Sequence, residues 1–224
     1  MTKYLKKDIQ TASKTLRKSI KDNKGLPSTL SIKDSTGKTR KLSKKEYMGL
    51  YEQSNVFAVK HNRLPNYVSL NTTANNPLVL DYQNTGYNCC PTSVSMASGF
   101  LFDWRSEDEC VKKLGTVQGS GTDPVKLVNN ISRLGMKATA IKRNSTAVRN
   151  SLRLGKPIVA HIQTRSASCL GYVGDYGHYI LIYGITDTHY KIADPTKGLK
   201  SCKFSILDKA TNGRDIKYYS ISPI

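Results

Sequence analysis

The pattern of hydrophobic positions changes from helical to extended partway along the second half of the chain. Between residues 92 and 154 apolar residues recur every three or four positions, the spacing of one buried helix face. This spacing predicts three helices: Thr92–Phe102, Pro124–Leu134 and Thr146–Leu154. Short apolar runs before and after them predict strands at Leu78–Tyr82, Pro157–Gln163, Tyr179–Ile185, Tyr190–Ala193, Ser201–Leu207 and Tyr218–Ile221. Because most strands follow the helices, the order favours an α+β fold with an antiparallel sheet.

The first seventy residues contain a weak internal repeat. The heptapeptide Leu26–Ile32 matches Leu64–Leu70 at an offset of 38 residues, although one such pair could arise by chance. Apolar residues with helical spacing, such as Tyr47, Leu50 and Tyr51, precede the second copy. Each unit is therefore predicted to run from a helix through a Leu-Pro turn into a short strand.

A polar, turn-rich segment, Asn71–Pro77, separates this region from the apolar pattern that follows. We interpret it as a linker between two domains, residues 1–72 and residues 78–224. The second has the length of an ordinary single domain.

The charge is positive and concentrated at the N-terminus. The chain carries a formal net charge of +19, and residues 1–75 contain 16 Lys and Arg against 5 Asp and Glu. Such a field favours a polyanionic partner: nucleic acid, anionic lipid headgroups or an acidic polysaccharide. A merely solvated lysine-rich surface is the alternative.

The absence of targeting signals and the spacing of the cysteines indicate the cellular compartment of the protein. The sequence MTKYLKKDIQ has no apolar stretch behind its lysines, and no run reaches the ~18 apolar residues of a membrane span. We therefore expect synthesis in the cytoplasm, no export signal and no membrane insertion. The five cysteines fit neither a disulfide framework nor a C-x-x-C zinc site, so we expect a reducing compartment. Cys110, Cys169 and Cys202 are expected to be small buried hydrophobes.

Cys89 is the candidate nucleophile because it stands immediately before the predicted helix Thr92–Phe102. A helix N-terminus offers unpaired N–H groups and the positive end of the dipole, which favour the reactive thiolate. Gln83 lies six residues upstream, where its amide could donate to an oxyanion together with the Cys89 backbone N–H. Neither residue alone is specific, since most single cysteines are inert and Gln83 could be an exposed loop residue.

His178 and Asp194 complete a candidate triad. His178 opens an apolar strand, which would hold it rigidly as a general base, and Asp194 ends the next strand, where it could orient the imidazole. Three other histidines, His61, His161 and His189, are competing candidates for the base. Asp175 is an alternative candidate for the orienting carboxylate. This chemistry requires no metal or cofactor, and we predict none.

These residues carry a resemblance to a known family. The segment Gln83–Ser93, with Gln-x5-Cys-Cys-Pro-Thr-Ser, resembles the Q-x5-C-G-P-T-S signature of papain-like peptidases of the bacteriocin-processing type. Gly177–Tyr179 and Ala193–Pro195 resemble the H-Y/F and D-P motifs of the same group. The resemblance implies a papain-like fold over about residues 78–200, in which a helix bearing Cys89 packs on the sheet. Cys90 stands where the family usually has Gly, so either thiol could be proposed as nucleophile; the spacing from Gln83 favours Cys89.

The N-terminal region resembles pseudomurein-binding repeats. The resemblance rests on Lys44–Met48, on Phe57 and on Asn62–Val68, which contains the central motif Asn-x-x-Leu-Pro. Gly25–Leu30 is a more degenerate copy of this motif. It implies wall-binding residues at Lys60, Arg63, Leu64, Pro65, Asn66 and Tyr67.

The two regions together resemble the pseudomurein endoisopeptidases of methanogen viruses and prophages. That family implies a monomer acting on the archaeal cell wall, where it cuts the isopeptide bond between an alanine carboxyl and a lysine ε-amine and so lyses the cell. Pseudomurein glycan carries a uronic acid, which suits a basic binding domain. The alternatives are a leader-trimming peptidase, a non-catalytic wall-binding protein and a nucleic-acid binder. The last lacks a recognised motif, and we expect no nucleic-acid partner.

Overall fold

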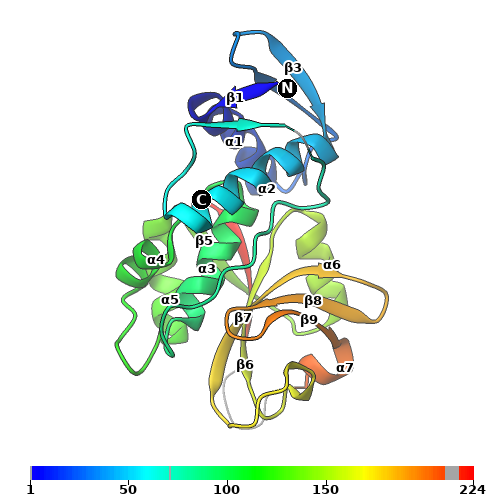
Figure 1. Cartoon of the computed structure of the whole chain (residues 1–224). Helices are drawn as coiled ribbons and strands as arrows, with labels where there is room; N and C mark the ends of the chain where they lie inside the picture. The colour runs from blue at the N-terminus through cyan, green and yellow to red at the C-terminus, as the bar shows by residue number, and fades with distance from the viewer. Residues whose placement is uncertain (1, 71, 210–216) are drawn as a thin grey trace.

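The computed structural model describes residues 2–70, 72–209 and 217–224 and consists of two units packed end to end (Figure 1). The C-terminal unit, residues 78–224, contains a six-stranded antiparallel sheet in the order β5-β10-β6-β7-β8-β9. Its strands are β5 Met136–Ile141, β6 Ile158–Gln163, β7 Gly177–Ile185, β8 His189–Asp194, β9 Gly198–Lys203 and β10 Tyr218–Pro223. Its α-helices are α3 Cys89–Phe100, α4 Glu107–Leu114, α5 Pro124–Asn130, α6 Ser145–Arg153 and α7 Phe204–Leu207, and α5 continues into a 3₁₀ turn, Ile131–Leu134. The predicted α+β class and antiparallel sheet are confirmed.

Both faces of the central strands are buried, which explains their nearly continuous apolar sequence. Along β7, Leu181 belongs to the cluster that includes Val94 and Ala97 of α3, while Ile180 and Ile182 belong to a second cluster with Val148 of α6. Successive side chains of a strand point to opposite faces, so a strand covered on both sides needs apolar residues at every position. Helix α3 therefore rests on one face of the sheet, and its first residue lies near the start of β7.

Three element predictions are wrong in detail. Leu78–Tyr82 is not a strand, because its backbone does not pair with a neighbouring strand; the Asp81 N–H donates instead to the side chain of Met96, at Sδ, at 3.4 Å. The predicted strand Ser201–Leu207 stops at Lys203, where Phe204–Leu207 turns into a helix whose apolar residues face the second cluster. The predicted helix Pro124–Leu134 tightens into the 3₁₀ turn for its last four residues.

The N-terminal unit, residues 2–70, is built from two copies of a strand–helix–strand motif. The first copy is β1 Lys3–Leu5, α1 Lys6–Lys21 and β2 Thr29–Lys33; the second is β3 Thr39–Ser43, α2 Lys44–His61 and β4 Tyr67–Ser69. Strands pair between copies: Lys3 faces Ser69 in β1–β4, and Lys41 faces Ser31 in β2–β3. These two pairs are related by the same offset of 38 residues. The predicted order of helix, Leu-Pro turn and strand is thus present twice, with an additional strand before each helix.

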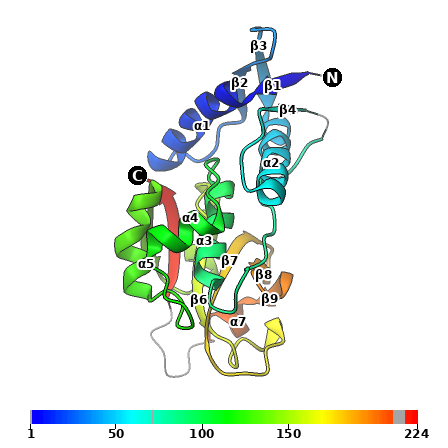
Figure 2. The same ribbon diagram turned by 60° about the vertical axis from the view of Figure 1, so that its left-hand side comes forward.

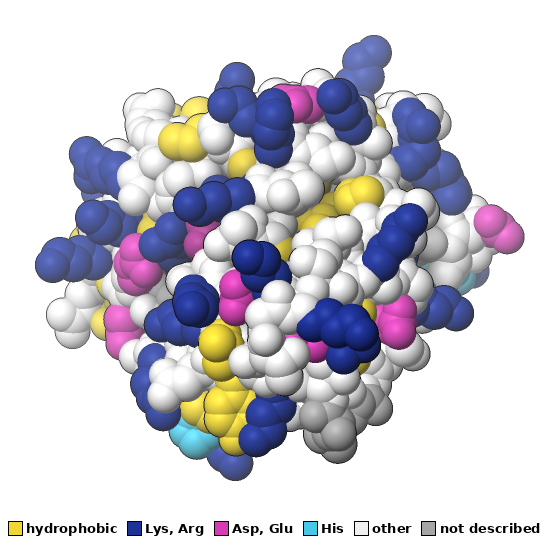
Figure 3. Space-filling model, turned by 90° about the horizontal axis from the view of Figure 1, so that it is seen from above, with side chains coloured by type: hydrophobic (Ala, Val, Ile, Leu, Met, Phe, Trp, Pro, Cys, Tyr) yellow, Lys and Arg dark blue, Asp and Glu magenta, His cyan; other side chains and the backbone are white. Residues whose placement is uncertain are grey.

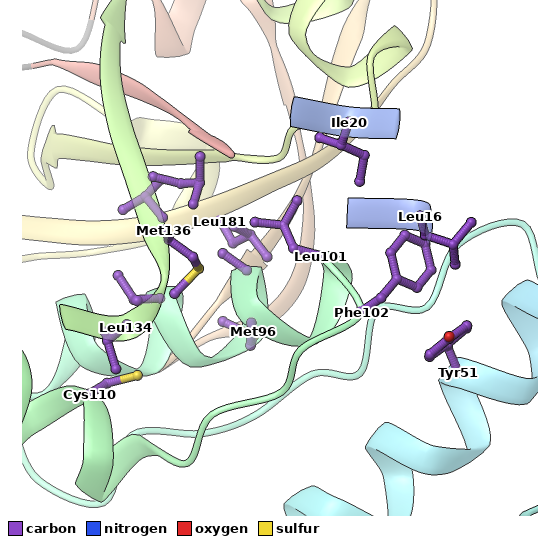
Figure 4. Packing of buried hydrophobic residues seen from close by; sticks show 14 of the residues in the cluster. Leu16, Ile20, Tyr51, Met96, Leu101, Phe102, Cys110, Leu134, Met136 and Leu181 are labelled. Carbon is purple, nitrogen blue, oxygen red and sulfur yellow. The ribbon is translucent and has the colours of Figure 1, made fainter. Parts of the chain in front are cut away.

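A shared hydrophobic core joins the two units. Figure 4 shows Leu16 and Ile20 of α1 beside Leu101 and Phe102, which follow α3, with Tyr51 of α2 near Phe102. The rings of Tyr51 and Phe102 meet edge to face with centroids 4.7 Å apart. The predicted linker therefore lies between two units of different topology, but the hydrophobic core is shared by both units. Asn71, its first predicted residue, lies outside the described residues.

Polar contacts at this joint are specific as well. The buried Asn55 side chain of α2 donates from Nδ2 to the carbonyl oxygens of Pro77, at 2.7 Å, and Gly99, at 3.1 Å. A Cβ at Gly99 would lie 3.1 Å from that amide nitrogen, so a glycine permits the close approach of α2 to α3. Figure 2 shows that β10 also ends beside α1.

No helix in the described parts of the chain is long and apolar enough to cross a membrane.

Candidate active site

Two adjacent cysteines at the start of α3 occupy very different environments. Cys89 is the first residue of the helix and is partly exposed, whereas Cys90 is fully buried. Burial and the neighbouring Cys89 raise the pKa of the Cys90 thiol well above its usual value. A neutral, buried thiol can neither meet a substrate nor attack it, so the geometry favours Cys89 as the nucleophile.

The start of α3 is held by a carboxylate that the sequence reasoning missed. Glu107, the first residue of α4, is buried and accepts hydrogen bonds from Asn88 Nδ2 at 2.6 Å and Thr92 Oγ1 at 2.7 Å. The backbone N–H of Asn84 donates to it too, at 3.2 Å. Glu107 therefore fixes residues on both sides of Cys89. Its position after Ser106, which caps α4, is the only sequence signal for it.

The neighbouring strands β7 and β8 bring His178 and Asp194 together, as the sequence predicted. The two side chains are 3% and 0% exposed, and His178 Nε2 lies 3.1 Å from Asp194 Oδ1. The backbone N–H groups of Thr196, at 2.8 Å, and Lys197, at 3.1 Å, also donate to Asp194 Oδ1. Burial alone would raise the pKa of Asp194, but His178 and the Thr196 N–H lower it below its usual value.

His178 links this carboxylate to the thiol. Burial lowers the pKa of His178, but hydrogen bonds with Asp194 and with Cys89 outweigh it and raise that pKa to about 9. Because Nε2 faces Asp194, the imidazole has Nδ1 left for the Cys89 side. The arrangement therefore favours a protonated imidazole beside Cys89 at neutral pH.

Tyr172 is a further member of this cluster that sequence reasoning did not find. Its hydroxyl donates to Asp194 Oδ1 at 2.8 Å and lies 3.0 Å from His178 Nε2. Tyr172 comes from the loop between β6 and β7, and Lys197 Nζ lies over its ring, 5.2 Å from the centroid. A tyrosine in a loop of 13 residues, Thr164–Tyr176, has no periodicity that could have indicated its position.

Gln83 lies beside the turn that follows Asp194. Its backbone N–H donates to the Pro195 carbonyl at 3.0 Å, and its Oε1 accepts from Thr196 Oγ1 at 3.1 Å. Its Nε2 donates to the Thr85 carbonyl at 2.6 Å, which uses one amide hydrogen and leaves the second for another acceptor. The predicted role as an oxyanion donor remains a prediction.

Other candidates from the sequence lie elsewhere. Asp175 is exposed and accepts from Gln163, so the carboxylate on His178 is that of Asp194. His161 stacks on Tyr179 with ring centroids 4.6 Å apart, His61 packs on Phe57, and His189 bonds Thr188. Among the described residues, no three His, Cys, Asp or Glu side chains are grouped as metal ligands.

The expectation for two cysteines is wrong. Cys169, from the loop that carries Tyr172, forms a disulfide with Cys202 of β9, with Cα atoms 5.4 Å apart. The partners are 33 residues apart, and only the fold brings them together. This pairing removes the argument for a reducing compartment that rested on cysteines without partners. Cys110 is a free, fully buried cysteine, as expected.

The residues predicted to bind cell wall fall into two groups. Leu64 and Pro65 line a cavity between the two units. Lys60, Arg63, Asn66 and Tyr67 are exposed. Arg63 covers the ring of Phe57 at 5.0 Å and Lys3 covers that of Tyr67 at 4.8 Å, so both basic side chains lie over aromatic rings.

Comparisons with known proteins agree with the fold and identify the family of the chain. The peptidase domain of Streptococcus ComA, a bifunctional ABC transporter involved in quorum sensing, is similar in structure, with a TM-score of 0.51 and 18% identity over 65% of this chain and 98% of that chain. A C39-like peptidase from Bacillus anthracis is also similar, with a TM-score of 0.47 and 13% identity over 64% of this chain and 94% of that chain. No curated protein matches the chain. The model of the peptidase C39 family matches residues 77–211, which contain all four predicted catalytic residues and leave out the N-terminal unit. The chain therefore belongs to the peptidase C39 family of papain-like cysteine peptidases.

Proposed function

We propose that this cysteine peptidase is an endoisopeptidase that cuts the Ala–ε-Lys bond in the peptide cross-bridges of archaeal pseudomurein, acting on the cell wall and lysing methanogen cells. Cys89 is its nucleophile, His178 its general base and acid, Asp194 the residue that orients His178, and Gln83 an oxyanion donor.

One observation carries the catalytic part of the proposal. Cys89 stands at the N-terminus of α3 in hydrogen-bonding contact with His178, whose Nε2 is held 3.1 Å from the buried Asp194. Nucleophile, base and orienting carboxylate are thus linked in a single chain of contacts, which is what acyl transfer by a thiol requires.

The choice of substrate rests on the N-terminal unit. Its internal repeat, with Leu-Pro before the last strand of each copy, supports the resemblance to pseudomurein-binding repeats. Its exposed lysines and arginines suit a glycan that carries uronic acid. Figure 3 looks onto this end of the molecule, where Lys and Arg side chains are spread over much of the visible face and outnumber the acidic side chains.

The proposed reaction has two steps. The Cys89 thiolate attacks the alanyl carbonyl carbon, and the Gln83 amide and the Cys89 backbone N–H stabilise the oxyanion. Collapse of this intermediate breaks the C–N bond while the His178 imidazolium gives its proton to the departing lysine amine. His178 then removes a proton from water, which attacks the thioester and releases the alanine carboxylate and the Cys89 thiolate.

The test measures the turbidity of a suspension of pseudomurein walls under mildly reducing conditions. Wild-type protein is expected to clear the suspension and release new lysine ε-amines, while Cys89→Ala clears nothing but still sediments with the walls. Sedimentation without clearing by wild-type protein would contradict the proposed substrate bond. Clearing by both proteins would contradict the assignment of Cys89.

Processing of a leader peptide is a second candidate. The similar structures include a double-glycine-motif protease from an AMS/PCAT transporter in complex with a leader peptide, with a TM-score of 0.48, 15% identity and coverage of 66% of this chain and 92% of that chain. A synthetic peptide with a Gly-Gly leader end and one with an Ala–ε-Lys isopeptide separate the two candidates. Faster cleavage of the Gly-Gly peptide would favour leader processing.

A further inference from the structure

Residues 83–88, which we call the oxyanion segment, connect the two groups that are proposed to stabilise the oxyanion. Gln83 carries its side-chain amide at one end, and the backbone N–H of Cys89 follows directly after the other end. Both donors must point at a single oxygen atom of the substrate. The conformation of the oxyanion segment therefore decides whether they can act together.

The Glu107 carboxylate holds both ends of the oxyanion segment. At one end, the backbone N–H of Asn84 donates to Glu107 Oε1 at 3.2 Å. At the other end, Asn88 Nδ2 donates to the same oxygen at 2.6 Å. The second oxygen, Oε2, accepts from Thr92 Oγ1 in the first turn of α3 at 2.7 Å. One side chain therefore fixes the separation between the residues that adjoin the two donors.

A second set of hydrogen bonds carries this constraint to the side chain of Gln83. The Thr85 carbonyl oxygen accepts from Gln83 Nε2 at 2.6 Å and from the Asn88 N–H at 3.3 Å. The amide of Gln83 is thus oriented by the stretch of backbone whose ends are bound to Glu107. Its second amide hydrogen is fixed in direction as a result, because the amide group is planar.

Glu107 is suited to this task because it is buried on a rigid element. It is 5% exposed and begins α4, which packs against α3. In the described parts of the chain, every hydrogen bond to its carboxylate comes from Asn84, Asn88 or Thr92. Burying a carboxylate costs free energy unless donors surround it, and hydrogen bonds to a charged group are about twice as strong as neutral ones. The carboxylate therefore holds the oxyanion segment firmly.

We propose that Glu107 is a positioning residue for acyl transfer, holding the Gln83 amide and the Cys89 backbone N–H where both donate to the same oxyanion. Glu107 itself does not touch the substrate. The proposal rests on the proposed function for the role of Gln83, but it applies to any acyl group that Cys89 accepts. A misplacement of about 1 Å costs roughly 100-fold in rate, so a displaced segment slows acylation strongly.

The test compares a reaction of Cys89 that needs the oxyanion donors with one that does not. N-acetyl-alanine p-nitrophenyl ester acylates the sulfur through a tetrahedral oxyanion: the C–S bond forms, and p-nitrophenolate leaves with the electron pair of the broken C–O bond. Iodoacetamide alkylates the same sulfur by displacing iodide, without an oxyanion. The other free cysteines, Cys90 and Cys110, are buried, and Cys89→Ala supplies the background rate of both reactions.

Glu107→Gln keeps the size of the side chain but replaces one acceptor oxygen with an NH₂ group, which then faces a donor. We expect the rate of the p-nitrophenolate burst to fall about 10- to 100-fold, while the alkylation rate changes less than twofold. Asp108→Asn is the matched control, because Asp108 is an exposed carboxylate in the same turn of α4. It is expected to change both rates less than twofold.

Two further variants test the route of the effect. Asn88→Ala removes the 2.6 Å hydrogen bond but leaves Glu107 in place, and the Asn88 side chain does not cap α3. This variant is expected to lower acylation about tenfold and to leave alkylation unchanged. In a Gln83→Ala background one donor is already lost, so adding Glu107→Gln should cost at least threefold less than it does in the wild type.

Four results would overturn the proposal. Unchanged acylation in folded Glu107→Gln would show that the oxyanion segment keeps its shape without the carboxylate. Equal losses of acylation and alkylation would assign Glu107 to the general stability of the site. Full additivity with Gln83→Ala would separate the two residues. A wild-type protein that reacts with iodoacetamide but not with the ester would lack working oxyanion donors. Because the ester contains no isopeptide bond, failure of wall hydrolysis and failure of this proposal are observed separately.

Discussion

The two ends of helix α3 carry polar groups that are organised in opposite ways. At its start, His178 and Asp194 are buried and every charge has a close partner. At its far end, Lys6, Lys7 and Lys14 border a cavity without an ion-pair partner in the described structure. Charges that are desolvated and paired depend strongly on each neighbour, whereas solvated charges act through their sum. Single substitutions should therefore have large effects at the first end and graded effects at the second.

The largest effect is expected for the two adjacent cysteines. Cys89→Ala should reduce kcat on a synthetic Ala–ε-Lys peptide by about 10⁴-fold or more, because the covalent step is lost. Cys90→Ala removes a fully buried thiol and should keep most of the activity, with a lower thermal midpoint. Steady-state kinetics and thermal unfolding of both variants test this, and an inactive Cys90→Ala protein that is still folded would reverse the assignment.

The next effect concerns the buried pair. Asp194→Asn should lower kcat by about 10²- to 10⁴-fold, since the amide orients His178 less well and does not stabilise its positive charge. In the wild type, the His178 pKa of about 9 means that the protonated imidazole is present at lower pH and is lost as the pH rises through that value. The descending alkaline limb of kcat/KM should therefore lie near pH 9 in the wild type and at lower pH in the variant. An unchanged alkaline limb would show that Asp194 does not raise the pKa of His178.

A smaller effect is expected at Tyr172. Tyr172→Phe removes the hydroxyl that donates to Asp194 at 2.8 Å and contacts His178 Nε2, and should lower kcat about tenfold with little change in KM. Tyr176→Phe is the matched control from the same loop, because the hydroxyl of Tyr176 makes no hydrogen bond to the His178–Asp194 pair. A shifted pH profile in the Tyr172 variant alone would identify it as a positioning residue. Equal losses in the two variants would assign the effect to the loop.

The smallest effect on catalysis is expected at the joint between the two ends. Asn55→Ala removes the Asn55 donor from the Pro77 carbonyl and one of two donors from the Gly99 carbonyl, which should lower the free energy of unfolding by about 1–3 kcal/mol. Turnover of a small soluble peptide should be unchanged below the unfolding temperature, because no contact with Cys89 is lost. Urea denaturation and kinetics on the same preparation decide this. A large loss of kcat would mean that the Asn55 contacts also determine the geometry around Cys89 at the start of α3.

Much of the fold was predictable because its signals are local. The spacing of apolar residues predicted α3, α6 and the strands β6, β7, β8 and β10 to within a few residues. Helix α4 was missed even though Ser106 and Glu109 mark its start and Gly115, with φ of 70°, its end. Strand β5 was missed because alternate positions carry polar or exposed side chains at the edge of the sheet, so its apolar run is weak.

In the candidate site, too, some residues have a local sequence signal and others have none. Cys89, His178 and Asp194 could be proposed from the sequence because each has a recognisable position relative to a helix or strand. Glu107 and Tyr172 could not, since a buried hydrogen bond between distant residues leaves no pattern in the chain.

The sequence by itself determined the α+β order of elements, the repeat at an offset of 38 residues, the concentration of positive charge and the pairing of a cysteine with a later His and Asp. Only the tertiary structure decided that Asp194 and not Asp175 faces His178, that Cys169 and Cys202 are joined, and that Cys90 is buried while Cys89 is partly exposed. It also decided that α1, Leu64 and Trp104 enclose one cavity. The physical reason is range: propensity and periodicity act over a few residues, whereas desolvation, hydrogen bonding and charge depend on groups that folding brings together from far along the chain.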